Sequence, residues 1–303
     1  MYKTILSFLF RRNKKTVPAS WSINYDFKGA VKYQSYIEVE ERISKFKHTA
    51  VIGTDSSKKY NMYLIEMGNR NKPCIMILAG LHGSEWQSTQ YCLEFMEQIR
   101  DNIFPDKKFR EEILNNFHIA FIPVGNPWGY DNTSPFSRLK GRNNANGVNL
   151  NRDFNDFSQS ESQNIRKVAE RLKPFSYLDC HLIAPRKDGG QNYEDIIIGN
   201  MTDDTNKIRD FIANSLTLYA NRPVGKWDKW TNDNHTGLSR RYMSNLDNPN
   251  TSKTWSFIFE MYRPVKNKQE IVRILTDQEI MKYGLAGLYL FFLASSNYLC
   301  NNK

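Results

Sequence analysis

A histidine and a glutamate three residues apart are the first candidates for chemistry in this chain. His82 and Glu85 follow the apolar run 75–79 through a turn that contains Gly80 and Gly83. Glycine lets the backbone bend sharply, and residues at i and i+3 of a helical turn point to one side. Imidazole nitrogen and carboxylate oxygen are both ligands of zinc. The pair indicates a metal site, although a glutamate favoured at a helix start by the helix dipole would give the same spacing.

A second histidine and a second glutamate follow two other apolar segments, at His181 and Glu260. Three neutral or anionic ligands with a fourth position for water are typical of a catalytic zinc site, which makes His181 a candidate third ligand. Asp179, two residues earlier, would share its strand face and either orient a ligand or make only a local hydrogen bond. Glu260 is either a solvated residue at a sheet edge or a general base in a dry site.

A polar segment, residues 142–154, lies between the two histidines and is rich in arginine and asparagine. The guanidinium groups of Arg142 and Arg152 can grip a carboxylate through two parallel hydrogen bonds, and an amide such as Asn151 adds a directional partner. This composition indicates a binding site for an anionic group.

The elements that must position these residues alternate between strands and helices. Two early strands are close enough to form a hairpin, and the third and fourth are separated by helical segments, which indicates a crossover between parallel strands. The expected fold class is α/β, with a mixed parallel and antiparallel sheet covered by helices on both faces. In such sheets ligands lie beyond the carboxyl ends of the strands. Strands are predicted at 49–53, 62–67, 74–79, 118–124, 177–180, 195–198 and 255–259, and helices at 35–46, 88–99, 109–114, 160–172, 206–220 and from 277 onward.

No repeat or flexible linker divides the 303 residues, so we predict one catalytic domain, residues 35–303, after an N-terminal extension, residues 1–34. The net charge of +10 favours acidic partners, but no nucleic-acid-binding motif accompanies it and no nucleic acid is expected. The four cysteines lack C-x-x-C spacing and are interpreted as small buried side chains.

The N-terminal apolar run is followed by Arg11 and Arg12 and makes a poor signal peptide, and the run 285–293 is too short to span a membrane. A cytoplasmic protein is therefore predicted, with export by another route left open. Oligomeric state does not follow from the sequence.

Four motifs, taken in order, resemble the zinc carboxypeptidase family of metallocarboxypeptidases. They are His82-x-x-Glu85, Gly147-Val148-Asn149-Leu150-Asn151-Arg152, His181 and Phe259-Glu260, and the resemblance spans roughly residues 35–295. It implies one zinc ion per chain, held by His82, Glu85 and His181. It also implies that Glu260 deprotonates the zinc-bound water and protonates the leaving amine.

The same resemblance assigns the substrate contacts. Asn151 and Arg152 would bind the terminal carboxylate of a peptide, and Arg142, with Arg138 as a rival, would polarise the scissile carbonyl. Tyr242 is the nearest match to the family's mobile tyrosine, or else an ordinary core or surface tyrosine.

One residue departs from the family pattern. The family has an aspartate where this chain has Asn149, at the position that accepts a hydrogen bond from the first zinc histidine. An amide oxygen can accept the same bond without charge, so zinc affinity or ligand basicity is expected to be lower.

Three functions compete. The first is a metallocarboxypeptidase that removes a C-terminal residue from a peptide or peptide-like substrate. The second is a related zinc amide hydrolase that acts on cell-wall stem peptides or on an N-acyl amino acid. The third, a non-catalytic binding module, is disfavoured because such a module has no need of Glu260. Among residues 225–258, Arg240, Arg241 or Lys253 would suit an acidic substrate side chain, unless they only form a basic surface.

Overall fold

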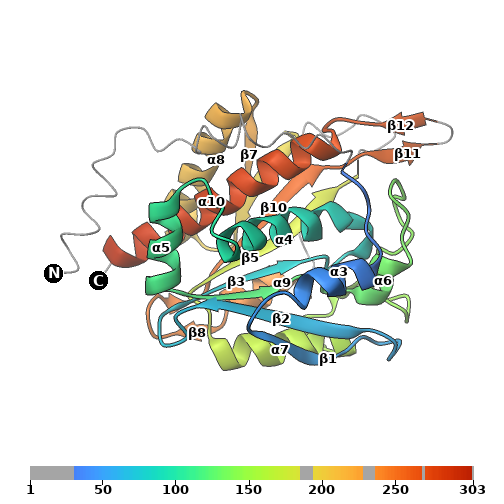
Figure 1. The fold of residues 1–303 in the computed structure, drawn as a ribbon, viewed down its shortest axis with the longest axis horizontal. Helices are drawn as coiled ribbons and strands as arrows, with labels where there is room; N and C mark the ends of the chain where they lie inside the picture. The colour runs from blue at the N-terminus through green and yellow to red at the C-terminus, as the bar shows by residue number, and fades with distance from the viewer. Residues whose placement is uncertain (1–30, 185–193, 228–235, 268–269, 302–303) are drawn as a thin grey trace.

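An eight-stranded mixed sheet forms the centre of the molecule (Figure 1). The computed structural model describes residues 31–184, 194–227, 236–267 and 270–301. The order across the sheet is β1 (Thr49–Thr54), β2 (Asn61–Gly68), β4 (His118–Ile122), β3 (Cys74–Ala79), β5 (Ser176–Ile183), β10 (Trp255–Tyr262), β6 (Ile196–Asn200) and β7 (Val224–Trp227). The strands β4, β3, β5 and β10 are mutually parallel, whereas β2 and β6 run antiparallel to their neighbours β4 and β10.

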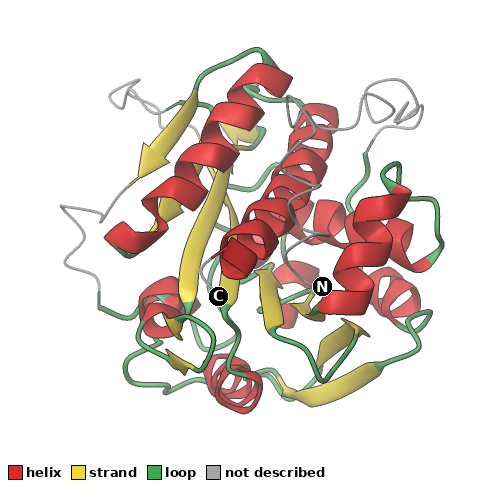
Figure 2. Cartoon of the chain, turned by 90° about the vertical axis from the view of Figure 1, so that its left-hand side faces the viewer, coloured by secondary structure: helices red, strands yellow, loops and turns green. Residues whose placement is uncertain are grey.

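Helices cover both faces of this sheet, as Figures 1 and 2 show. On one face, α10 (Asp277–Asn301) packs against α4 (Trp86–Arg100), α5 (Lys107–Asn116) and α8 (Asn206–Ala220). On the other face, α7 (Ser160–Leu172) packs against β1, and α9 (Ser239–Ser244) packs against β5 and β10. Two short helices, α3 (Tyr36–Ile43) and α6 (Pro127–Asp131), contact each other. The predicted α/β fold class is confirmed.

Alternation of buried side chains divides the core between the two faces. In β3, Ile75 and Ile77 belong to the larger cluster under α4 and α10, whereas Met76 and Leu78 belong to the cluster under α7. Because both faces of a central parallel strand are covered, every residue of β3 is buried. This burial explains why the segment reads as an uninterrupted apolar run.

Several sequence predictions about local structure are confirmed. β1 and β2 form the antiparallel hairpin, and β3 and β4 are parallel neighbours. The capping box also forms, because the Thr276 hydroxyl accepts from the Glu279 backbone N–H and the Glu279 carboxylate accepts from the Thr276 backbone N–H. The sequence prediction omitted β7, α6, α9 and two small hairpins, β8 (Asp247–Asn248) with β9 (Ser252–Lys253) and β11 (Val265–Asn267) with β12 (Glu270–Val272).

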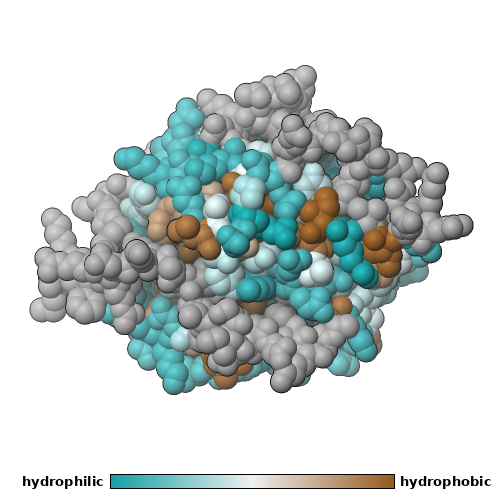
Figure 3. Space-filling model, turned by 90° about the horizontal axis from the view of Figure 1, so that it is seen from above, coloured by the Kyte–Doolittle hydropathy of each residue, from teal (hydrophilic) through white to brown (hydrophobic). Residues whose placement is uncertain are grey.

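Most of the predicted N-terminal extension, residues 1–30 of 1–34, lies outside the described residues. Cys74, Cys92 and Cys180 are free and buried, as expected. Among the described helices, none combines the length and apolar character needed to cross a membrane. The described residues on the face seen in Figure 3 are mainly hydrophilic, with small separate groups of hydrophobic residues.

Candidate metal centre and active site

The turn after β3 brings His82 and Glu85 to the same side. His82 is the N-cap of a short 3-10 turn, η1 (Gly83–Glu85), which leads directly into α4. Gly80 has a φ of +61°, a conformation that favours glycine. At Gly83, an added Cβ would lie 2.0 Å from the Tyr130 backbone nitrogen. The two glycines are therefore required by the bend and by the close approach of a second backbone segment.

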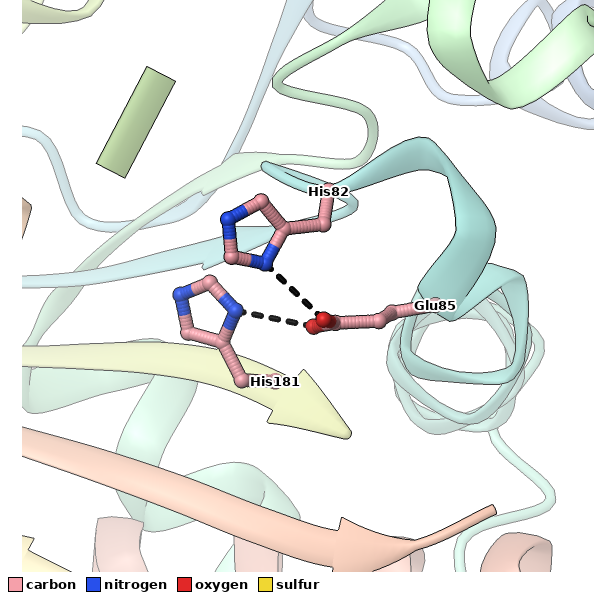
Figure 4. Close-up of side chains that lie close together, drawn as sticks. All are labelled: His82, Glu85 and His181. Atoms are coloured by element: carbon pink, nitrogen blue, oxygen red, sulfur yellow. Dashed lines mark hydrogen bonds and ion pairs between the residues drawn. The ribbon is translucent and has the colours of Figure 1, made fainter. Parts of the chain in front are cut away.

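Three ligand-type side chains converge at the carboxyl end of the central strands (Figure 4). His82 and Glu85 follow β3, and His181 lies in the neighbouring strand β5. Candidate ligand atoms of all three lie within 4.8 Å of one another. The Nδ1 atoms of His82 and His181 lie 2.8 Å and 2.9 Å from the two carboxylate oxygens of Glu85. The side chains are buried, so the cluster is a preformed donor set shielded from bulk solvent.

The outer nitrogen of each imidazole lies beside a side-chain oxygen. His82 Nε2 donates to Asn149 Oδ1 at 2.9 Å, which is the contact that the sequence indicated for Asn149. His181 Nε2 lies 3.1 Å from Asp179 Oδ1. The Nδ1 atom of each histidine therefore points toward the Glu85 carboxylate, in the centre of the cluster. Two histidines and a glutamate with oriented outer nitrogens fit a zinc ion.

Burial and neighbouring charge set the protonation of this cluster in the metal-free protein. Burial lowers the pKa of His82 to about 4. Burial alone would raise the pKa of Glu85, but the two imidazoles outweigh it and hold that pKa well below its usual range. For His181 burial is also opposed, because the carboxylates of Asp179 and Glu85 raise its pKa. A charged Glu85 and a neutral His82 are forms that bind metal, whereas His181, with its raised pKa, must release a proton when it binds a metal.

Glu260 lies beside the candidate metal cluster of His82, Glu85 and His181 because β10 pairs with β5. The register of this parallel pair places Glu260 opposite His181. Its Oε2 atom is shielded from solvent and has no hydrogen-bond partner among the described residues. Burial raises the pKa of Glu260 to about 8, and the charge of Glu85 adds to the rise. Such a carboxyl group can exchange a proton near neutral pH.

Arg142, and not its rival Arg138, has its side chain on the metal cluster. Its Nη1 donates to Glu85 Oε1 at 2.9 Å. Arg138 contributes its backbone carbonyl, which accepts from Arg263 Nη2 at 3.1 Å. Arg263 also donates from Nη1 to the Ser137 carbonyl at 2.7 Å, and burial lowers its pKa to about 10. Arg263 therefore fixes the segment that leads to Arg142.

Asn151 and Arg152 lie in a second short turn, η2 (Leu150–Arg152), at the same edge of the sheet. The Asn151 side chain is buried, with Oδ1 accepting from the Ser239 backbone N–H at 3.0 Å and Nδ2 lying 3.3 Å from His181 Nε2. Arg152 is exposed, and its Nη1 donates to the Asn151 carbonyl at 2.6 Å. Asn151 is thus joined to the metal cluster, while the Arg152 side chain reaches solvent.

Tyr242 is not brought to the cluster. Its hydroxyl donates to Glu170 Oε1 at 3.1 Å, and its ring packs edge-on against Phe157 with centroids 4.9 Å apart. These contacts lie on the α7 side of α9. In this structure Tyr242 is packed away from the cluster, and its role as the family's mobile tyrosine stays a prediction.

Two residues near the site were absent from the sequence prediction, Arg263 and Ser239. Arg263 could have been proposed from the sequence, because it is a charged residue three positions after Glu260, at the end of a mainly apolar segment. Ser239 could not be predicted from the sequence, because it lies in the short helix α9, whose residues show no clear hydrophobic periodicity.

An α/β fold with a buried His-Glu-His donor set at the carboxyl edge of its sheet is the arrangement of a zinc hydrolase site. Residues 33–224 match the zinc carboxypeptidase family, and the chain belongs to that family. The match contains His82, Glu85 and His181.

Individual relatives are similar over shorter stretches. Carboxypeptidase E of Caenorhabditis elegans is 36% identical over 90 residues, which cover 28% of this chain and 19% of the relative. Carboxypeptidase SOL1 of Arabidopsis thaliana is 28% identical over 174 residues, 54% of this chain and 33% of the relative. The chain thus matches a third or less of the length of these two relatives.

Solved structures share the fold at low sequence identity. A metallo-carboxypeptidase from Burkholderia cenocepacia matches with a TM-score of 0.64 and 15% identity over 87% of this chain and 68% of that one. Bovine thrombin-activatable fibrinolysis inhibitor, in complex with tick carboxypeptidase inhibitor, matches with a TM-score of 0.64 and 16% identity over 90% of this chain and 99% of that one.

Proposed function

We propose that this protein is a zinc-dependent metallocarboxypeptidase that hydrolyses the C-terminal amide bond of a peptide or peptide-like substrate. The observation that carries the proposal is the convergence of the donor set His82, Glu85 and His181 with Glu260 and Arg142 at one edge of the sheet. Zinc, when bound by the three ligands, would supply Lewis acidity to the carbonyl and to water.

Glu260 is the general base and acid in this proposal. Its pKa of about 8 in the metal-free protein lies near neutrality, where a carboxyl group is effective both as proton acceptor and as proton donor. It takes a proton from the attacking water and returns one to the leaving amine. The shielded Oε2 leaves an acceptor for that proton.

The two arginines act on different parts of the substrate. Arg142, held against Glu85, is positioned to stabilise negative charge that develops on the carbonyl oxygen. Arg152 is exposed beside the cluster and suits the free terminal carboxylate. Because the side chain of Asn151 already contacts Ser239 and His181, we assign the larger share of carboxylate binding to Arg152.

The test is hydrolysis by the zinc-loaded protein, measured as released amino acid by mass spectrometry. Peptides with free C-termini are compared with the same peptides amidated at the C-terminus, with muropeptides and with N-acyl amino acids. Release of single C-terminal residues from the free peptides alone supports the proposal. Cleavage restricted to muropeptides or acyl amino acids would favour the related amide hydrolase, and absence of any hydrolysis would refute both.

We further propose that the released residue has an acidic side chain, because Arg240 is buried beside the site. Arg240 is 4% exposed and follows Ser239, whose backbone holds Asn151. Its positive charge also lowers the pKa of Glu260, against the effect of burial. Lys253, by contrast, is exposed.

Arg241 offers a matched control for this preference, since it has the same charge, is the next residue of α9 and is only partly buried. We expect Arg240→Gln to lower kcat/KM for peptides ending in glutamate by about 10- to 100-fold, the value of a charge-assisted hydrogen bond. Peptides ending in leucine should be affected much less, and Arg241→Gln should leave the ratio of the two substrates unchanged. An unchanged ratio in Arg240→Gln would refute the acidic preference.

A further inference from the structure

Ser239 lies at the centre of a buried hydrogen-bonded network around His181. Its hydroxyl donates to Asp179 Oδ2 and accepts from the Tyr177 hydroxyl, the latter at 3.2 Å. Its backbone N–H donates to Asn151 Oδ1 at 3.0 Å. Asp179 and Asn151 both lie against His181 Nε2, at 3.1 Å and 3.3 Å. We call these five residues the Ser239 network.

All members of the Ser239 network are buried. Tyr177, Asp179 and Ser239 are 0% exposed, and His181 is 1% exposed. A carboxylate removed from water to this extent is destabilising unless it has a charged or hydrogen-bonded partner. The Ser239 hydroxyl donates to Asp179 Oδ2, whereas Asp179 Oδ1 lies 3.1 Å from His181 Nε2 at ion-pair distance, without hydrogen-bond geometry in the metal-free protein.

The chemistry of a metal-bound histidine specifies what Asp179 does. If His181 Nδ1 gives its lone pair to a metal, the neutral imidazole carries its proton on Nε2 and needs an acceptor there. The nearest carboxylate oxygen is Asp179 Oδ1. Such an outer acceptor fixes the tautomer and the ring orientation, and raises the basicity of the ligand.

The other histidine lacks this charge. His82 Nε2 donates to Asn149 Oδ1, an uncharged amide oxygen. Each outer nitrogen therefore has one side-chain oxygen beside it, and of these two oxygens only Asp179 Oδ1, on the His181 side, belongs to a carboxylate.

We propose that Asp179 is the positioning residue of this metal centre, that it supplies to His181 the outer negative charge that Asn149 does not supply to His82, and that Ser239 holds it in place. The inference rests on the proposed zinc site. It also connects the metal ligand to Asn151, because the same serine binds Asp179 through its hydroxyl and Asn151 through its backbone.

The test measures zinc affinity by chelator competition on the metal-free protein, without reference to activity. Asp179→Asn keeps the shape of the side chain and removes the charge, and we expect it to weaken zinc binding by about 10- to 100-fold. Adding Asn149→Asp to that variant should recover at least part of the loss, since it returns a carboxylate to the other histidine. Cobalt substitution gives a second readout, in which the visible absorption of Asp179→Asn should differ from that of the parent.

Ser256 offers a matched control for Ser239. Both serines are 0% exposed, but Ser256 lies in β10 outside the network. Ser239→Ala should weaken zinc binding and Ser256→Ala should leave it unchanged, and this pair decides the question if Asp179→Asn does not fold.

The zinc measurements distinguish failure of the proposed function from failure of the role assigned to Asp179. A parent protein that binds no zinc would refute the proposed function itself. A parent that binds zinc, with Asp179→Asn and Ser239→Ala binding it equally tightly, would overturn the role of Asp179 and leave the proposed function standing.

Discussion

Replacement of Glu260 by glutamine tests two roles of this carboxyl group, its part in turnover and its effect on the pH dependence of stability. Glutamine has nearly the same shape but cannot exchange a proton. In the zinc-loaded protein, Glu260→Gln should abolish turnover and retain the metal, because Glu260 is not among the three candidate ligands. In the metal-free protein, the same change should alter the pH dependence of stability.

The sign and size of that effect follow from the raised pKa. Between the ordinary value of 4.5 and about 8, the folded protein holds a proton that the unfolded chain has released. Stability contributed by Glu260 is therefore present at low pH and is lost as the pH rises through this window. One pKa unit is worth 1.36 kcal/mol, so the whole window amounts to at most about 5 kcal/mol. The partial exposure of Glu260 reduces this figure, and we expect about 2–4 kcal/mol.

The assay is urea unfolding of the metal-free proteins at pH 5 and pH 8. Other titrating groups are common to parent and variant, so the difference between them isolates Glu260. Glu260→Gln should be close to the parent at pH 5 and more stable than the parent at pH 8. The exposed Glu111→Gln on α5 is the control for loss of a carboxylate. An equal difference at both pH values would refute the burial argument, and retained turnover would refute the role as general base.

Three further predictions concern the rest of the site. Arg142→Ala should lower kcat by about 100- to 1000-fold while zinc content is retained, whereas an unchanged kcat would refute its role on the carbonyl oxygen. Gly83→Ala should destabilise the protein by about 2–4 kcal/mol in urea unfolding, because the added Cβ would lie 2.0 Å from the Tyr130 backbone nitrogen. Gly147→Ala is the control: no atom lies within 4 Å of its added Cβ, so it should destabilise the protein by only about 1 kcal/mol. Equal destabilisation by the two variants would contradict the steric explanation. Zinc removal by a chelator should abolish hydrolysis and lower the thermal midpoint, and both should return on addition of zinc; a midpoint independent of zinc would argue against a site in the folded protein.

The sequence by itself determined seven of the eight strands of the sheet and the three residues of the candidate metal site. The apolar run of β3 and the β1–β2 hairpin were predictable because strand periodicity and connection length are local properties. His82, Glu85 and His181 were predictable because each lies at or just beyond the carboxyl end of a predicted strand, and parallel neighbours bring such ends together. The contact between Asn149 and His82 followed from the family pattern.

Only the tertiary structure decided which polar side chains support that cluster. Tyr242 and Ser239 lie three residues apart in α9, yet Tyr242 packs with Phe157 and Ser239 contacts Asp179. A short helix carries no strong hydrophobic periodicity, so the sequence does not specify which of its faces meets the sheet. Likewise Arg142 and Arg138 are alike in the sequence, and it is the fold that directs only the first onto Glu85. The candidate ligands His82, Glu85 and His181 lie at the ends of strands, and these strands can be predicted from the local sequence. The side chains that contact the outer nitrogens of the histidines are set by long-range packing, which cannot be predicted from the local sequence.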